Sequence, residues 1–237
     1  MRIIGAIKNE LSLSSFKPNK KYLEYAFSDK IAGVPVGVKG VIDRVDIWGN
    51  KFIVIDYKTG DSSFDNYTDV ASGKKLQLLV YAKAFADKNK LNPVGVFYLP
   101  IKNSFKASEQ NYKFSGVIDG DKSNLLAMDN NLTLPNYKSS VINLSTTKSG
   151  EFYKNSSFLT KMCIDSADFD FLVNFAINQV KVATQNILDG DINPHPLKVQ
   201  NSSACDYCEF GGLCGYLNDN DRVVKPVDTI QELKGDK

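Results

Sequence analysis

The chain has 237 residues, of which 43% are hydrophobic, 24% charged and 11% aromatic, a globular composition that excludes disordered, collagen-like and low-complexity proteins. With 29 Lys and Arg against 27 Asp and Glu, the net charge of +2 neither requires nor excludes a nucleic-acid partner. No apolar run approaches the ~18 residues that a membrane span needs, so we expect a soluble, cytoplasmic protein with no membrane partner. The single histidine, His195, lies between two prolines, which argues against triads and metal sites built on histidine.

The first half of the sequence changes from a helical to an extended pattern. Apolar residues at helical spacing predict a helix in residues 1–16, without a capping residue before it. The following segments are predicted as three strands at 22–27, 34–47 and 51–58, a helix at 74–87 and a further strand at 94–99.

The second half is less regular. Residues 102–157 are polar, with a short strand-like segment at 140–144. Ser166 is predicted as the N-cap of a helix that runs to about Leu188, with Gly190 just beyond its end. The tail from Asn193 is expected to be loop-like. Strands with flanking helices and no second clear core predict one α/β domain.

A predicted β-hairpin carries the most informative residues. Gly49-Asn50 suits a two-residue turn, and the resulting register places Asp43 directly opposite Asp56. Because side chains alternate along a strand, Lys58 lies on the same face as Asp56. Two carboxylates with Cβ atoms about 4.5–5.5 Å apart repel each other unless a cation lies between them or one stays protonated. Such oxygen ligands favour Mg²⁺ or Mn²⁺, and Lys58 is suited to polarise a bound water or stabilise a phosphate.

The same residues also have a structural interpretation. Asp56 and Lys58 could form a surface salt bridge at a strand end, with Asp43 paired to Arg44 or to a distant lysine. The alignment of Asp43 and the apolar run before Asp56 favour the metal site instead.

The predicted helix after the hairpin adds a polar pair. Gln77 and Tyr81 are four residues apart and therefore share one helix face. A glutamine embedded among apolar residues is costly unless it has partners, although such a residue more often lies at the edge of a core than in a functional site.

Three motifs together resemble a known family, the RecB-type branch of the PD-(D/E)xK nucleases. They are Gly40-x-x-Asp43-Arg44-Val45-Asp46, Ile55-Asp56-Tyr57-Lys58-Thr59-Gly60 and Gln77-x-x-x-Tyr81. The closest resemblance is to the C-terminal nuclease domain of the B subunit of AddAB helicase–nucleases, from about Lys21 to Tyr216. It implies a restriction-endonuclease-like mixed central sheet flanked by helices.

The resemblance also implies roles for the hairpin residues. Asp43 and Asp56 are implied to bind Mg²⁺ or Mn²⁺ together with the backbone carbonyl of Tyr57. Lys58 is implied to assist the attacking water and to stabilise the transition state.

Three further residues enter through the same resemblance. Gln77 and Tyr81 are implied to steady the site and the DNA backbone near the scissile phosphate. Glu24, on the strand before the hairpin, occupies a position where the family often has an acidic residue.

Cys205, Cys208 and Cys214 form a Cys-x2-Cys-x5-Cys cluster in the tail. Three cysteines so close together in a cytoplasmic protein indicate Zn²⁺ or an iron–sulfur cluster rather than disulfides. The resemblance implies three ligands of a [4Fe–4S] cluster, with a fourth cysteine upstream of the nuclease core. No cysteine precedes Cys163, whose own role is open, so we expect the chain to be the end of a longer parent protein that holds the cluster. The alternative is three reduced thiols in a loose tail.

The hypothesis from sequence is a Mg²⁺-dependent DNA exonuclease domain. Residues 1–20 are expected to end an upstream helical region, 21–192 to form the nuclease core and 193–237 the cysteine-bearing C-terminal tail. The resemblance implies action on single-stranded DNA ends, with the helicase–nuclease A subunit, in the processing of double-strand breaks for recombination. The alternatives are a stand-alone RecB-type nuclease like the CRISPR-associated relatives, and a non-catalytic module that binds DNA ends.

Overall fold

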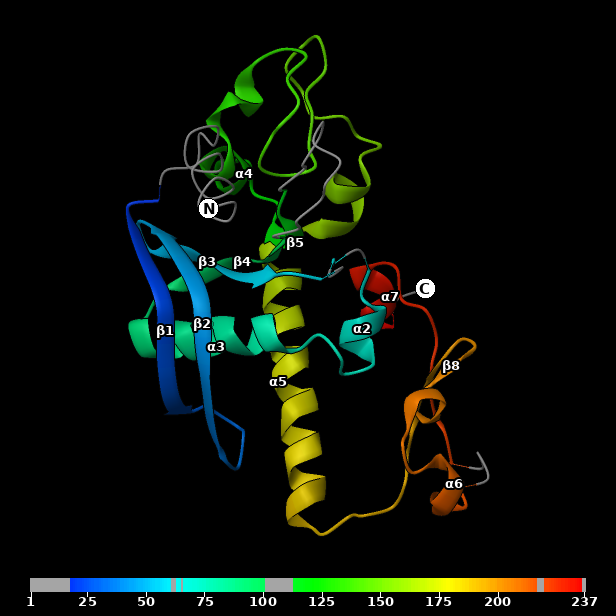
Figure 1. The fold of residues 1–237 in the computed structure, drawn as a ribbon. Coiled ribbons are helices and arrows are strands. Elements are labelled where there is room, and N and C mark those ends of the chain that lie inside the picture. Colours follow the sequence, from blue (N-terminus) through cyan, green and yellow to red (C-terminus); the bar gives the residue numbers. More distant parts are fainter. Residues whose placement is uncertain (1–17, 61–62, 65, 101–112, 217–219, 236–237) are drawn as a thin grey trace.

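A six-stranded mixed sheet lies at the centre of the computed structural model, which describes residues 18–60, 63–64, 66–100, 113–216 and 220–235 (Figure 1). The expected α/β class with a mixed sheet and flanking helices is confirmed, whereas the helix expected at 1–16 lies outside the described residues. The strands follow the chain in the order β1-β2-β3-β4-β5-β6. Their bounds are β1 Lys20–Lys30, β2 Gly37–Trp48, β3 Lys51–Lys58, β4 Asn92–Pro100, β5 Ser115–Asp119 and β6 Cys163–Ile164.

The β2–β3 hairpin has the predicted register. Pairing runs antiparallel from Trp48 and Lys51 to Arg44 and Ile55, and Gly49 in the turn has the positive φ of 59° that glycine adopts readily. β4 then joins β3 in parallel, with the helix α3 (Gln77–Asn89) as the crossover. The carboxyl ends of β3 and β4 therefore lie at the same edge of the sheet.

Helix α3 begins three residues later than the predicted Lys74. Gly73 (φ 83°) ends a short preceding helix, α2 (Thr68–Ala71), and the backbone N–H groups of Lys74 and Lys75 donate back to the carbonyl of Asp69. These two lysines therefore complete the turn after α2 instead of starting α3.

The long helix α5 (Ser166–Leu188) occupies the predicted range, but the predicted cap is wrong. The N-cap is Asp165, whose carboxylate accepts from the Asp168 N–H at 2.7 Å. Ser166 Oγ instead donates to the Asp119 carboxylate at 2.7 Å, which ties the start of α5 to the end of β5.

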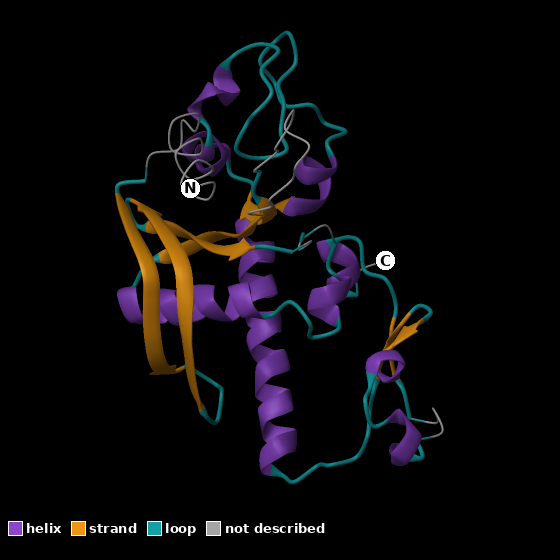
Figure 2. Ribbon diagram, viewed as in Figure 1, coloured by secondary structure: helices purple, strands orange, loops and turns teal. Residues whose placement is uncertain are grey.

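The segment between β5 and β6 folds mainly as short helices and loops beyond the sheet (Figure 2). The strand-like piece expected at 140–144 is not a strand, because it forms only an isolated bridge between Ile142 and Phe114. The buried Asp129 organises this region by accepting from Ser139 Oγ at 2.6 Å and from the Tyr137 hydroxyl at 3.0 Å. The short elements are α4 Lys122–Met128, η1 Asn130–Thr133 and η2 Phe158–Met162.

The tail is more ordered than the loop-like chain that the sequence predicts. A second, three-stranded sheet has the order β8-β7-β9, and the helix α7 docks back on the core through the buried Ile230. Lys234 Nζ also pairs with Asp168 on α5 at 2.7 Å. The bounds are β7 Leu197–Val199, β8 Ser202–Ser203, η3 Ala204–Tyr207, α6 Gly211–Cys214, β9 Arg222–Val224 and α7 Ile230–Lys234.

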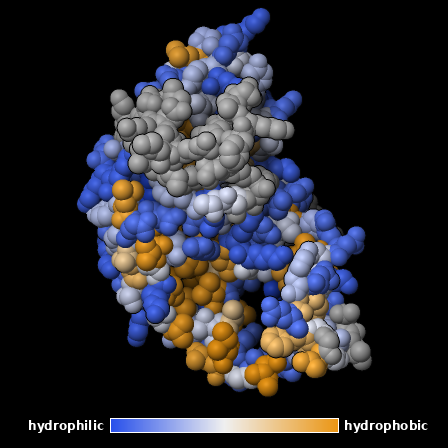
Figure 3. All heavy atoms as spheres, viewed as in Figure 1, coloured by the Kyte–Doolittle hydropathy of each residue, from blue (hydrophilic) through white to orange (hydrophobic). Residues whose placement is uncertain are grey.

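A hollow separates the tail from the C-terminal half of α5. Hydrophobic side chains gather in this lower region in Figure 3, and Val182, Ile187 and Leu188 are among the exposed apolar residues. The cavity has a volume of about 730 Å³, and Ala183, His195 and Arg222 belong to its lining. No helix in the described ranges is long and apolar enough to cross a membrane.

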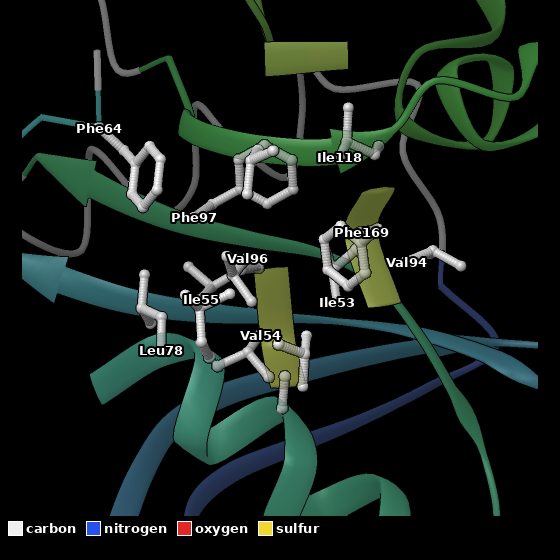
Figure 4. Packing of buried hydrophobic residues seen from close by; sticks show 14 of the residues in the cluster. Ile53, Val54, Ile55, Phe64, Leu78, Val94, Val96, Phe97, Ile118 and Phe169 are labelled. Carbon is white, nitrogen blue, oxygen red and sulfur yellow. The ribbon is translucent and has the colours of Figure 1, made fainter. Parts of the chain in front are cut away.

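The hydrophobic core is centred on β3, which is buried on both faces. Ile53, Val54 and Ile55 have no exposed surface, and Figure 4 shows them within the buried hydrophobic cluster. The Phe52 ring packs against Phe85 of α3, with centroids 4.8 Å apart. Residues buried on both faces are typical of a central strand next to a parallel neighbour, so the end of β3 is held rigidly.

Gly116 gives a test of this close packing. A Cβ at Gly116 would lie 2.0 Å from the Val96 backbone oxygen and 2.8 Å from Phe97 Cα, which are backbone atoms of β4. We expect Gly116→Ala to lower the free energy of unfolding by at least about 2 kcal/mol in urea denaturation. Gly37→Ala is the control, because a Cβ there meets nothing within 4 Å. Equal stability of the two variants would contradict the described β4–β5 packing.

Candidate active site

The candidate site lies where the β2–β3 ladder ends. Beyond Arg44 and Ile55, β2 continues to pair with β1 and β3 with β4, so the two strands diverge in Figure 1. Asp43 and Asp56 are the next residues on the two strands. The Asp43 carboxylate accepts from the Tyr57 N–H at 2.8 Å, and this bond connects β2 to β3 beyond the last residue pair of the ladder. The divergence leaves carboxylates from both strands at the same level of the sheet.

Asp56 is the most strongly constrained acid of the site. Its residue is only 5% exposed, and the Lys58 ammonium lies 2.7 Å from Oδ2. Apart from this ion pair, no hydrogen-bond donor reaches Oδ2 within the described residues. Burial raises the pKa of the Asp56 carboxyl; Lys58 opposes this shift, and the Asp43 carboxylate adds to it. A buried carboxylate in this state gains from a further cation.

Tyr98 is a site residue that sequence reasoning missed. The parallel β3–β4 register places it beside Asp56, and the Lys58 ammonium lies 5.4 Å from the centre of its ring. Burial, with the neighbouring carboxylates Asp56 and Asp69, raises the pKa of Tyr98 to about 12. The phenol therefore stays protonated at neutral pH and is able to donate a hydrogen bond. Its position in the apolar strand predicted at 94–99 gave no signal, because the parallel register is not encoded locally.

Helix α3 brings Gln77 and Tyr81 to the same face of the sheet. Phe52 packs on α3, and alternation along β3 puts Asp56 and Lys58 on the face of Phe52. Gln77 is exposed at the first residue of α3 rather than embedded in apolar surroundings, and its Nε2 donates to the Tyr81 hydroxyl at 3.0 Å. The expectation of an embedded glutamine is therefore wrong, whereas the shared helix face is confirmed.

Gly40, the first residue of the motif that contains Asp43, leaves room for the Tyr81 ring. A Cβ at Gly40 would lie 2.8 Å from a ring carbon of Tyr81 and 3.0 Å from one of Phe27. The rings of Phe27 and Tyr81 meet edge to face, with centroids 5.5 Å apart. The absence of a side chain at Gly40 therefore fixes how closely α3 approaches β1 and β2.

Glu24 lies at the level of Asp43 on the neighbouring strand. The β1–β2 ladder pairs Leu23 with Arg44 and Tyr25 with Ile42, which leaves Glu24 opposite Asp43. Its φ of 48° is unusual for a residue other than glycine, and its side chain is exposed. Such strained backbone is frequent at functional sites.

A buried ion pair supports the site from the other face of β2. Arg44 donates to Asp46 through Nε at 2.9 Å and Nη2 at 2.6 Å, and both residues are buried. Arg44 Nη1 also donates to the Tyr57 hydroxyl at 3.3 Å. The side chain of Tyr57 is thereby fixed on one face while its N–H holds Asp43. Sequence reasoning did not identify this pair.

The cysteines of the tail are not gathered into one metal site. Cys205 is half-buried, while Cys208 and Cys214 are exposed. In the parts of the chain that the structure describes, no group of three or more His, Cys, Asp or Glu is arranged to hold a metal ion. The described conformation thus does not fit an assembled cluster. Cys163 lies apart, and burial raises the pKa of its thiol to about 12.

The Arg44–Asp46 pair gives a stability prediction. Asp46→Ala leaves a buried guanidinium without its carboxylate, so the free energy of unfolding should fall by about 3–5 kcal/mol in urea denaturation. The double variant Arg44→Met/Asp46→Leu should lose less, because it removes both charges. Asp29→Ala breaks the exposed pair with Lys88 and should change little. A loss after Asp46→Ala no larger than after Asp29→Ala would contradict the role of the pair.

Comparison with known proteins identifies the family of the chain. Residues 9–215 match the family model described as the PD-(D/E)XK nuclease superfamily. Proteins named as the B subunit of an ATP-dependent helicase/deoxyribonuclease are similar along most of the chain. The relative from Clostridium tetani is 28% identical over 89% of this chain and 20% of its own length, and that from Caldanaerobacter subterraneus subsp. tengcongensis 30% over 91% and 20%. The relative from Clostridioides difficile is 28% identical over 98% of the chain and 23% of its own length.

The chain thus spans about a fifth of the length of these curated relatives. The matched range contains all three motifs and the whole six-stranded sheet. The chain belongs to the PD-(D/E)XK nuclease superfamily, as a RecB-type nuclease domain of the kind found in AddAB B subunits.

Proposed function

We propose that this chain hydrolyses DNA phosphodiester bonds with the help of a divalent cation held by Asp43 and Asp56. The observation that carries the proposal is the buried Asp56 carboxylate, whose Oδ2 lies beside Lys58 and has no other partner within the described residues. A surface salt bridge does not require burial of its acid. The burial of Asp56, together with a second carboxylate on the adjacent strand, supports a cation site instead.

The donor set fits Mg²⁺ or Mn²⁺. Both cations prefer carboxylate and carbonyl oxygens, and the Tyr57 carbonyl is the third protein ligand that we propose. The Tyr57 N–H bond fixes the Asp43 carboxylate, and the hydroxyl of Tyr57 is fixed by Arg44. The ligands are thereby oriented before any ion binds. A bound divalent cation would lower the pKa of a coordinated water and neutralise charge on the scissile phosphate.

Lys58 provides the positive charge that the reaction needs beside the cation. Its side chain is 31% exposed, so the ammonium is accessible to a substrate while it stays close to Asp56. We assign to it the orientation of the attacking water and the stabilisation of negative charge that develops on the phosphate. Gln77 and Tyr81 are proposed to hold the DNA backbone, and Glu24 is a further acid at the level of Asp43.

We further propose that this domain acts as an exonuclease on single-stranded DNA ends in the cytoplasm. The names of the relatives support a helicase-associated deoxyribonuclease with an A subunit as partner. Processing of double-strand breaks for recombination is the corresponding role. Cys205, Cys208 and Cys214 are proposed as three ligands of a [4Fe–4S] cluster, whose binding would require a conformation other than the described one.

The nuclease proposal is tested with end-labelled single-stranded DNA and Mg²⁺ or Mn²⁺. The unchanged chain should degrade the DNA only when the metal is present. Asp43→Ala, Asp56→Ala and Lys58→Ala should each lower the rate by about 100-fold or more, because each removes a metal ligand or the charge that stabilises the transition state.

Lys83→Ala is a matched control for Lys58→Ala. Lys83 also pairs with an aspartate at 2.7 Å and has a similar exposure of 28%, but it lies within α3. The Lys83→Ala variant should degrade DNA as fast as the unchanged chain. Full activity of any of the three site variants would refute the mechanism. A well-folded chain that binds DNA without cleaving it would support the non-catalytic module instead.

The four cysteines give a prediction about reactivity, because the Cys163 thiol differs from the three thiols of the tail. At pH 8 a thiol with a pKa of about 12 is thiolate in only about one molecule in ten thousand. In the metal-free folded chain, an excess of a thiol reagent should therefore modify three cysteines rapidly, with Cys163 reacting only after denaturation. Cys163→Ser is the control and should leave the rapid phase at three thiols. A rapid phase of four thiols would contradict the raised pKa of the Cys163 thiol.

A further inference from the structure

A cavity of about 390 Å³ lies beside the proposed catalytic site. Its position follows from the sheet, because Asp56 pairs with Tyr98 on β4 and Tyr98 pairs with Ser115 at the start of β5. Two strand spacings separate Asp56 from Ser115, about 10 Å between backbones. Ser115 belongs to the cavity lining, so this part of the cavity lies at the sheet edge where β3 ends.

Two chain segments complete the wall of this cavity. The segment after β3 is tied down by the Phe64 N–H, which donates to Ser115 Oγ at 2.8 Å. The irregular segment before β6 is held by the Phe114 N–H, which donates to the Val141 carbonyl at 2.8 Å. The cavity is therefore formed by anchored backbone, and its first wall continues directly from the strand that carries Lys58.

The lining combines an apolar floor with a basic and polar rim. Phe114 and Phe158 contribute to the floor and are buried. The rim includes two lysines, Lys113 and Lys138, with Ser63 and Asn143. Among the described residues, no carboxylate belongs to the lining. This chemistry suits an anion with an apolar part, as in a nucleotide.

Within the described residues, the two lysines lack a counterion. The side chain of neither Lys113 nor Lys138 forms an ion pair or hydrogen bond with any residue of these ranges. Lys113 is partly buried, and its burial lowers the pKa of its ammonium group. The positive charge of the neighbouring Lys138 lowers this pKa further. Freely solvated surface lysines do not show this effect. An anion between the two ammonium groups would relieve both the desolvation and the repulsion.

We propose that this cavity is a subsite for the DNA strand, in which Lys113 and Lys138 bind a backbone phosphate next to the nucleotide that is cleaved. The proposal rests on the nuclease function proposed above and adds a substrate contact to it. The phosphate contact is independent of base sequence, as suits an enzyme that degrades a strand progressively. The apolar floor accommodates the attached sugar or base.

The test is the salt dependence of DNA binding, measured by fluorescence anisotropy with a labelled oligothymidylate in EDTA, where no cleavage occurs. Each phosphate contact of a single strand contributes about 0.7 to the slope of log affinity against log salt. Lys113→Gln and Lys138→Gln should each reduce the slope by about this amount and weaken DNA binding about three- to tenfold at low salt. The double variant should reduce the slope by about twice this amount. With metal, the KM for DNA should rise while kcat is retained.

Lys122→Gln is the matched control. Lys122 is exposed at the start of α4, beyond the opposite end of β5, so the same charge is removed away from the cavity. It should keep the original slope, and Lys113→Arg and Lys138→Arg should largely restore binding. Unchanged melting temperatures would exclude misfolding, and Lys138 is exposed enough for its variant to fold in any case.

The outcomes separate the subsite from the nuclease function. If the unchanged chain cleaves and binds DNA but the double glutamine variant has the original slope, or loses no more than Lys122→Gln, the subsite is refuted and the nuclease function stands. If the unchanged chain neither binds nor cleaves DNA, both proposals fail. If the salt-dependence slope falls in the Lys113 and Lys138 variants but not in Lys122→Gln, the subsite is supported.

Discussion

The Asp56 carboxylate is buried at the point where β2 and β3 diverge, and most features of the site respond to this one charge. Lys58 lies against it, Asp43 is held on the adjacent strand by the Tyr57 N–H, and Tyr98 lies beside it in the parallel register. In the core of a protein such a charge is destabilising. Here the Lys58 ammonium offsets part of this cost, and the apolar part of β3, buried on both faces, holds the carboxylate in a fixed position.

Different residues support the site on the two faces of the sheet. On one face, the missing side chain of Gly40 lets Tyr81 approach β1 and β2, which sets the position of α3. On the other face, Arg44 donates to the hydroxyl of Tyr57 and is itself held by the Asp46 carboxylate. The motif residues thus include a glycine that allows close packing (Gly40) and a buried ion pair (Arg44 and Asp46), as well as candidate chemical groups. A substitution in this region need not contact DNA to alter the geometry at Asp56.

The sequence was sufficient for the parts of the fold that local chemistry determines. Gly49-Asn50 fixes the hairpin register as far as Arg44 and Ile55, which leaves Asp43 and Asp56 as the next residues on the two strands. Tyr98 was not predictable, because a parallel register with an irregularity near Phe52 depends on a crossover helix. Asp165 and Ser166 are both good caps, so that only tertiary contacts decide between them. The chemical roles of the site residues remain predictions.

The tail sheet has a mechanical consequence for the cysteines. Parallel pairing of Leu197 with Arg222 and of Val199 with Val224 brings the two ends of the cysteine segment together, so the segment forms a closed loop. Arg222 Nη2 also donates to the Ser72 carbonyl, just before the helix that carries Gln77. Val227 adds a second connection, because its N–H donates to Thr68 Oγ1 and its carbonyl accepts from the Tyr67 N–H. The tail is thus attached on both sides of α2, in the segment that leads into the helix carrying Gln77 and Tyr81.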